Sequence, residues 1–140
     1  MTTNGHETHI YVGIAGEGDF VGQGGMIRRT LGDSEWQPIA KGLPENPQVR
    51  ALAIHPDNPA VIFAGTQDGP YRSDDRGEHW EALDAPKADV WSLAFRPGNP
   101  DVVYAGYEPC GIARSEDGGA TWQKMDTSRV KYPDVTTYMP

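Results

Sequence analysis

The sequence contains few of the residues that mark several common kinds of protein. Cys110 is the single cysteine among 140 residues, so an internal disulfide framework is excluded. The four histidines have no metal-ligand spacing, and no apolar run is long enough to span a membrane. Twelve basic residues against 20 acidic ones give a net charge of −8, which disfavours electrostatic capture of nucleic acid or anionic lipid. We therefore expect no metal, no cofactor, no nucleic-acid partner and no membrane partner.

The chain does contain internal repeats. Residues 73–80 and 115–122 share Ser, Asp, Gly and Trp at the same spacing, with an offset of 42 residues. Residues 52–59 recur as 93–100 with an offset of 41, and each copy runs into an apolar segment that ends in Ala-Gly. A fixed period near 40 residues with strand-like content is typical of β-propeller blades.

Each repeat contains four short apolar segments bounded by Gly, Pro, Asn and Asp, which is the pattern of strands between turns. No segment has a long apolar period of 3.6 residues, so little helix is expected. The strands predicted for the last full repeat are 90–95, 102–107, 111–115 and 121–125. Those predicted for the preceding repeat are 49–54, 61–66, 70–73 and 79–83.

The two ends of the chain are out of phase with this unit. Segments 10–14, 25–30 and 35–39 correspond to a second, third and fourth strand with no first strand before them, whereas 135–139 corresponds to a lone first strand. The sequence thus predicts an all-β fold of about three four-stranded antiparallel blades with permuted ends, part of a six- to eight-bladed ring. After a tail at 1–8, the propeller segment 9–140 divides into blades at about 9–48, 49–89 and 90–132, followed by the strand 135–139.

Three blades are too few to close a ring, because propellers have four to eight blades. Two explanations stay open. The chain is a piece of a longer propeller, or 135–139 completes the first blade of a neighbouring copy and two chains form a six-bladed dimer. In both cases strand edges and apolar blade faces favour association.

The pattern Ser-x-Asp-x-Gly-x-x-Trp resembles the Asp-box of the BNR-repeat propellers found in sialidases, xyloglucan-cleaving glycoside hydrolases, sortilin-type receptors and YCF48-like photosystem assembly factors. The first blade keeps Trp36 but lacks the box Asp. In the resembling families the box is a structural turn on the face opposite the active site. The matching residues are Ser73, Asp75, Gly77 and Trp80, and Ser115, Asp117, Gly119 and Trp122.

An arginine precedes each box, and we assign Arg29, Arg72 and Arg114 to this repeat position. A sialidase-like enzyme would use such arginines to bind a substrate carboxylate. Their equivalent place in every repeat favours a structural role instead, and the Arg-Ile-Pro motif of sialidases is missing.

Candidate site residues lie on loops that connect second to third and fourth to first strands, because these loops converge around the central channel of a propeller. Asp68 and Glu108 are candidate catalytic carboxylates, since glycoside hydrolysis needs two. Ligand-binding candidates are Glu17 and Asp19 in a long glycine-rich loop, together with Trp91 and Tyr107, whose rings suit stacking on a sugar or a peptide side chain. Surface acids and interblade packing are the competing interpretations of these residues.

We favour a noncatalytic binding or assembly scaffold that recognises a carbohydrate, peptide or protein on its channel face. The alternative is a glycoside hydrolase completed by missing blades or by a partner chain. Residues 1–8 lack the basic and apolar regions of a signal peptide, which suggests the cytoplasm for the chain as it stands. Removal of a signal from a secreted precursor leaves the compartment open.

Overall fold

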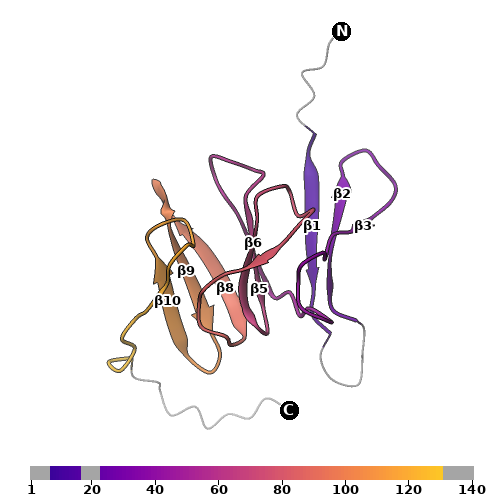
Figure 1. Cartoon of the computed structure of the whole chain (residues 1–140). Helices are drawn as coiled ribbons and strands as arrows, with labels where there is room; N and C mark the ends of the chain where they lie inside the picture. The colour runs from indigo at the N-terminus through magenta and orange to yellow at the C-terminus, as the bar shows by residue number, and fades with distance from the viewer. Residues whose placement is uncertain (1–6, 17–22, 131–140) are drawn as a thin grey trace.

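Three antiparallel β-sheets stand side by side in the computed structural model, which describes residues 7–16 and 23–130 (Figure 1). Blade 1 contains β1 (His9–Ile14), β2 (Gly25–Thr30) and β3 (Gln37–Pro38). Blade 2 contains β4 (Ala51–Ile54), β5 (Ile62–Thr66), β6 (Gly69–Ser73) and β7 (Glu81–Ala82). Blade 3 contains β8 (Val90–Arg96), β9 (Asn99–Tyr107), β10 (Gly111–Ser115) and β11 (Gln123–Lys124).

In each sheet, strands that follow one another in the chain are neighbours. Blade 1 has three strands because its sheet begins at the position that β5 and β9 hold in the other blades, and this confirms the predicted phase of the repeats. The all-β propeller-blade fold is likewise confirmed. The described residues contain no helix at all, and hence none that could cross a membrane.

The turns at 73–80 and 115–122 are called the box turns, and the strands that follow them are shorter than predicted. Only 81–82 and 123–124 are paired, whereas the sequence predicted 79–83 and 121–125. The hydrogen bonds of the box turn occupy the residues before each last strand, so these residues are not available to the sheet. The predicted strand at 135–139 lies outside the described residues.

The two box turns have the same internal hydrogen bonds. The Ser73 hydroxyl donates to the Asp75 carboxylate at 2.8 Å and accepts from the Gly77 amide at 2.8 Å. The same carboxylate accepts from the His79 amide at 2.9 Å. The turn at Ser115 repeats this pattern with Asp117, Gly119 and Thr121. Gly119 has a φ of 96°, a left-handed conformation that favours glycine.

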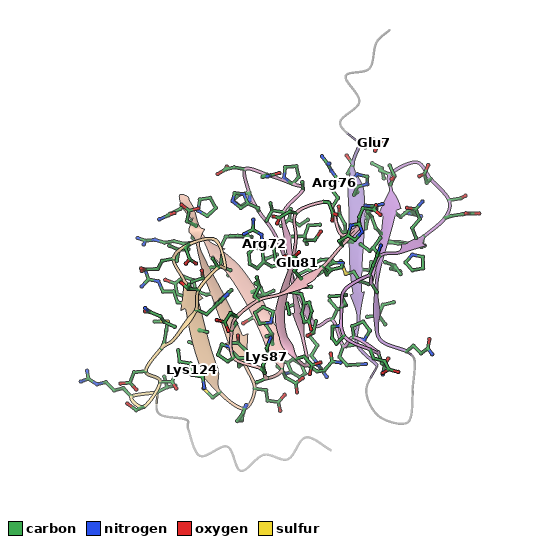
Figure 2. The ribbon with its side chains drawn as sticks, in the orientation of Figure 1. Glu7, Arg72, Arg76, Glu81, Lys87 and Lys124 are labelled. Atoms are coloured by element: carbon green, nitrogen blue, oxygen red, sulfur yellow. The ribbon has the colours of Figure 1, made fainter. Side chains whose placement is uncertain are left out.

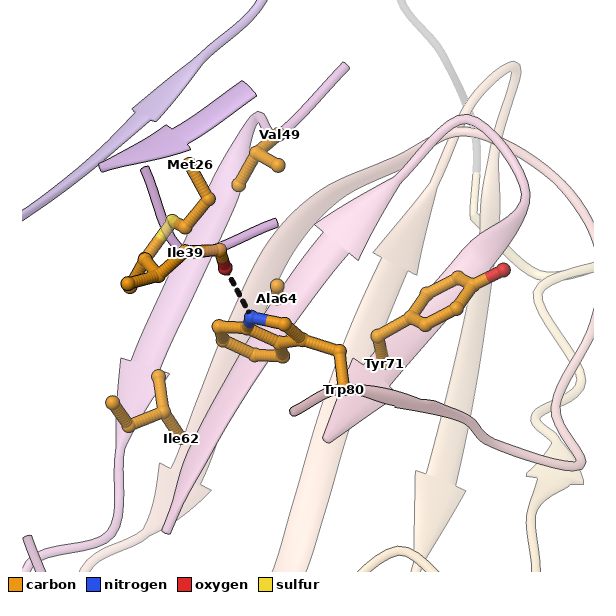
Figure 3. Packing of buried hydrophobic residues seen from close by; sticks show 7 residues of the cluster. All are labelled: Met26, Ile39, Val49, Ile62, Ala64, Tyr71 and Trp80. Carbon is orange, nitrogen blue, oxygen red and sulfur yellow. Dashed lines mark hydrogen bonds between the residues drawn. The ribbon is translucent and has the colours of Figure 1, made fainter. Parts of the chain in front are cut away.

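The box tryptophan of blade 2 packs into blade 1. Trp80 is 3% exposed, and its Nε1–H donates to the Ile39 carbonyl at 2.7 Å (Figure 3). Around it lie side chains from both blades, namely Met26, Ile39, Val49, Ile62, Ala64 and Tyr71. A second cluster joins blades 2 and 3 through Val61, Phe63 and Val103. The core of this protein therefore lies between blades.

A glycine on the second strand of each blade allows the next blade to approach. A Cβ atom on Gly13 would lie 2.6 Å from Val49 Cγ1, and one on Gly65 would lie 2.6 Å from Val90 Cγ1. Such distances are far shorter than a van der Waals contact, so these positions require glycine. By strand register, Gly106 holds the equivalent position on β9, the second strand of blade 3.

Arginines on the third strands link neighbouring blades. Arg72 Nη1 donates to the Gly118 carbonyl at 2.6 Å, and Arg28 Nη1 donates to the Arg76 carbonyl at 2.9 Å. The assignment of Arg29 to this position is therefore wrong. Arg29 points to the other face of its strand, where its Cζ lies 4.9 Å from the centre of the Trp36 ring. The sequence did contain a signal for Arg28, namely its distance from the tryptophan. Trp36 follows Arg28 by eight residues, as Trp80 follows Arg72.

We predict that the box carboxylates make stability depend on acid pH. Hydrogen bonds from the Thr121 hydroxyl and amide and from Ser115 lower the pKa of Asp117 to about 2. The unfolded chain has an Asp pKa of about 3.9, so this stabilisation is complete above about pH 4 and is lost as the pH falls through about 2. Thermal unfolding followed by circular dichroism from about pH 2 to about pH 6 should show a shallower loss in Asp117→Asn than in the wild type. Asp84→Asn, at an exposed position outside the box, is the control, and equal pH slopes for all three proteins would contradict the assignment.

Candidate ligand-binding face

The loops predicted to carry function lie at one end of the sheets, and the box turns lie at the other. In an antiparallel blade, the turn from second to third strand and the connection from fourth to first strand reach the same end. Figure 2 shows Lys87 of the β7–β8 connection at the opposite end of the molecule from Arg76 of a box turn. The edge strands β4 and β8 of blades 2 and 3 lie beside each other. We call the end that carries Lys87 the channel face.

Side-chain amides connect the loops of blades 1 and 2 on this face. The Gln67 side-chain oxygen accepts from the Gln48 amide at 2.8 Å, and Gln67 Nε2 donates to the Asn46 carbonyl at 3.2 Å. The Gly24 amide donates to the Asn46 side chain at 2.8 Å. These bonds join the end of the long glycine-rich loop, the β3–β4 connection and the β5–β6 turn.

An exposed tryptophan lies between blades 2 and 3. Trp91, the second residue of β8, is 49% exposed. The Arg50 guanidinium carbon lies 5.1 Å from its ring centre, and Arg50 Nη1 pairs with Asp89 Oδ1 at 3.1 Å. The Asp89 carbonyl in turn accepts from the Glu108 amide at 3.0 Å. The indole is therefore held by a cation on one side while about half of its surface remains open to a ligand.

A cavity of about 250 Å³ lies beside blade 3 on the same face. Its lining includes Tyr107, Glu108 and Lys124. Among the described residues, no group forms a hydrogen bond with the buried Tyr107 hydroxyl. Burial raises the pKa of Tyr107 to about 12, so this phenol is neutral at physiological pH and offers both a donor and an acceptor.

A larger cavity, of about 560 Å³, lies between blades 1 and 2 at the end that carries the box turns. His9, Tyr11, Ile54 and Arg76 are among its lining residues. None of the site residues predicted from the sequence lines it.

The structure brings some of the predicted site residues together and separates others. Tyr107 and Glu108 line one cavity, whereas Asp68 is exposed on the β5–β6 turn of the neighbouring blade and does not line it. The Asp68 amide is held by the Thr66 hydroxyl at 3.1 Å. Glu17 and Asp19 lie outside the described residues. In the described part of the chain, no group of three or more His, Cys, Asp or Glu side chains is placed to hold a metal ion.

Arg50, whose guanidinium lies over the Trp91 ring, was not predicted. The repeat contained a signal for the arginine, because Arg50 and Trp91 follow the equivalent valines Val49 and Val90. Side chains at the same repeat position in adjacent blades lie beside each other around a channel. Comparison of equivalent positions in adjacent blades therefore identifies pairs, such as Arg50 and Trp91, that no single sequence motif contains.

Comparison with solved structures finds proteins of the same fold. An ancestral GH74 enzyme is 26% identical with a TM-score of 0.62, and the match covers 71% of this chain and 15% of that one. The GH74 enzyme of Niastella koreensis is 19% identical with a TM-score of 0.64, covering 85% and 21% of the two chains. YCF48 bound to D1 peptide is 15% identical with a TM-score of 0.56, covering 73% and 34%.

These neighbours are β-propeller proteins, and this chain spans 15 to 34% of their lengths. No protein-family model matches the chain, and no curated protein matches it either. The comparisons therefore support a β-propeller fold at the level of architecture.

The buried phenol predicts a loss of stability at alkaline pH. The pKa of Tyr107 is about 12 in the folded chain and about 10 in an unfolded one. Neutral Tyr107 therefore stabilises the fold fully below about pH 10, and this contribution is lost as the pH rises through about 12. Urea unfolding at intervals from about pH 8 to about pH 11 should show a smaller decrease in Tyr107→Phe than in the wild type. Tyr104→Phe, on the same strand, is the control, and a decrease as large in Tyr107→Phe as in the control would contradict the assignment.

Proposed function

We propose that this chain is a noncatalytic binding scaffold whose channel face holds a peptide segment that carries Lys or Arg side chains. The observation on which the proposal rests is the half-exposed Trp91, fixed between blades by the Arg50–Asp89 pair. An exposed indole that is already held in place loses little conformational freedom when a ligand stacks on it.

The charge of the face and of the chain favours a basic partner. Three carboxylates lie on channel-face loops of blades 2 and 3, namely Asp68, Asp89 and Glu108, and Asp89 pairs with Arg50. The chain has a net charge of −8, so a cationic peptide is attracted over a long range at low ionic strength. A Lys or Arg side chain over the open part of the indole gains a cation–π contact. A sugar ring stacks on the same indole but gains nothing from the acidic surroundings, and we therefore favour the peptide.

The binding test compares a basic probe with two others. Fluorescence anisotropy should show that a labelled hexalysine peptide binds, that its affinity falls with added salt, and that a labelled hexaglutamate peptide does not bind. Trp91→Ala should weaken hexalysine binding about tenfold, which corresponds to about 1.4 kcal/mol for a partly desolvated cation–π contact.

Ile54→Ala is the matched control, because Ile54 is an exposed apolar residue at the end of β4 that lies away from the channel face. Equal affinity of the wild type and Trp91→Ala would contradict the proposal. Binding of a xyloglucan oligosaccharide that depends on Trp91, without binding of hexalysine, would replace the peptide with a carbohydrate.

The second candidate is a glycoside hydrolase, which the 26% identity to an ancestral GH74 enzyme favours. In this hypothesis Asp68 and Glu108, on corresponding turns of adjacent blades, are the two carboxylates that such hydrolysis needs. The full chain should then release reducing sugar from xyloglucan, and Asp68→Asn and Glu108→Gln should each abolish the release while Asp84→Asn retains it. The absence of release by the wild type would exclude this candidate for the chain.

A further inference from the structure

A cavity of about 350 Å³ lies between blades 2 and 3 at the end that carries the box turns. Blade 2 contributes the β4–β5 connection, β5 and β6 to its walls, and blade 3 contributes β8, β9 and a box turn. All of the lining residues therefore belong to the two blades whose four strands are described.

The cavity of about 560 Å³ between blades 1 and 2 lies at the corresponding place. Tyr11 and Phe63 are equivalent residues, because they pair with Arg28 on β2 and Arg72 on β6. Each of the two aromatic residues lines the cavity between its own blade and the next. The two cavities can therefore be compared position by position.

Arg76 and Gly118 are equivalent residues of the two box turns. The Arg76 amide donates to the Ala60 carbonyl at 3.0 Å, and the Gly118 amide donates to the Asp101 carbonyl at 2.8 Å. Both residues have a left-handed backbone, with φ values of 60° and 68°. One cavity is thus lined by an arginine at the position where the other is lined by a glycine.

The glycine leaves room in the cavity between blades 2 and 3. Apart from its chain neighbours, a Cβ atom on Gly118 would have one heavy atom within 4 Å, namely Arg72 Nη1 at 3.6 Å. This distance is an ordinary van der Waals contact. A side chain that entered along the direction of Arg76 would therefore find open space.

The interblade arginine beside each cavity has a carboxylate partner of its own. Arg72 Nε and Nη2 lie 2.9 and 2.7 Å from Asp74 Oδ1, and Arg28 pairs with Glu78 in the same way. The cavity between blades 1 and 2 is lined by Arg76, whose carbonyl accepts a hydrogen bond from Arg28. Two guanidinium groups therefore already share that place when one of them is balanced by a carboxylate.

Two more carboxylates line the cavity between blades 2 and 3, and neither has a cationic partner among the described residues. The side chain of Asp101 makes no hydrogen bond or ion pair in the described part of the chain. Asp117 accepts hydrogen bonds from Ser115 and Thr121, which are neutral. These bonds lower the pKa of Asp117 to about 2, so its carboxyl group is ionised at neutral pH. The cavity is therefore negatively charged.

Aromatic rings form the apolar part of the wall. The His55 ring packs edge to face on Phe95 with 5.3 Å between ring centres, and Phe95 packs in the same manner on Phe63 at 5.4 Å. His55 Nδ1 accepts two backbone amides of the following turn, each at 3.1 Å, so this nitrogen carries no proton and the imidazole adds no positive charge. A planar cation packs well on such rings.

We propose that the cavity between blades 2 and 3 binds the guanidinium group of an arginine side chain from a partner protein. The group occupies the place that corresponds to the Arg76 side chain, donates to the Asp101 carboxylate and packs on Phe95. An arginine is the occupant because its planar fork can donate twice to one carboxylate while its face stacks on a ring. The site lies at the opposite end of the sheets from Trp91 and is independent of the channel face.

The test follows backbone amide signals of the full chain by NMR during titration with N-acetylarginine amide. The Gly118 and Asp101 signals should shift and reach saturation, because these residues line the cavity. N-acetylcitrulline amide has nearly the same shape without the charge, and it should leave both signals in place.

Two variants locate the binding site. Asp101→Asn should weaken binding about fivefold, as expected for the loss of one partly exposed ion pair. Gly118→Arg should abolish binding, because its own guanidinium group fills the cavity. The backbone tolerates arginine here, since Arg76 has nearly the same φ in the equivalent turn. The amide spectrum itself checks that each variant is folded.

Two further variants are controls. Asp84→Asn makes the same change of charge at an exposed position outside the cavity and should bind as the wild type does. Trp91→Ala should also retain the shifts of Gly118 and Asp101, which separates this site from the channel face. Unmoved Gly118 and Asp101 signals, an equal response to the citrulline probe, unchanged affinity in Asp101→Asn or binding that persists in Gly118→Arg would each overturn the proposal.

Discussion

The packing of each box tryptophan and its turn against the last strand of the preceding blade is the contact on which the rest of the structure depends. A single blade has too little apolar surface to form a core, and its outer strand is only two residues long. Trp80 fills the space between blades 1 and 2 and donates a hydrogen bond to the Ile39 carbonyl, so one residue satisfies both packing and polar requirements. Removal of such a ring from a core costs about 3–5 kcal/mol in other proteins. Arg72 and Arg28 then fix the rotation of one blade against the next, because each must reach a particular carbonyl.

The two ends of each blade differ in how their polar and aromatic side chains are used. At the box end of each blade, hydrogen bonds form within the turn and between blades. The carboxylates of Asp75 and Asp117 accept hydrogen bonds within their own turns. The channel face carries the residues that the fold does not use in this way, among them the half-exposed Trp91 and the phenol of Tyr107, which has no hydrogen-bond partner among the described residues. Binding at this face therefore leaves the interblade contacts at the box end unchanged.

Much of the fold could be predicted from the sequence, because the backbone of a box turn dictates its residue types. Gly77 and Gly119 are needed for their positive φ, and Ser73 and Ser115 for their short hydroxyls, so the repeat is visible at fixed spacing. The candidate site was harder to predict, because it is assembled from different blades. Arg50 lies beside Trp91 only because adjacent blades place equivalent residues next to each other. The interblade arginine of blade 1 was misassigned because Arg28 and Arg29 differ by one position in a strand, and only the distance to Trp36 distinguishes them. Glu17 and Asp19 lie outside the described residues and stay predictions.

Amide hydrogen exchange of the wild type and of Trp80→Phe tests most directly whether neighbouring blades depend on the box tryptophan. The substitution keeps an aromatic ring between blades 1 and 2 but removes the hydrogen bond to the Ile39 carbonyl. The account predicts that the amides of β2 and β5, on the two sides of Trp80, exchange faster in the variant, whereas those of β9 and β10 in blade 3 are unchanged. Equal protection of β2 and β5 in the two proteins would contradict this account.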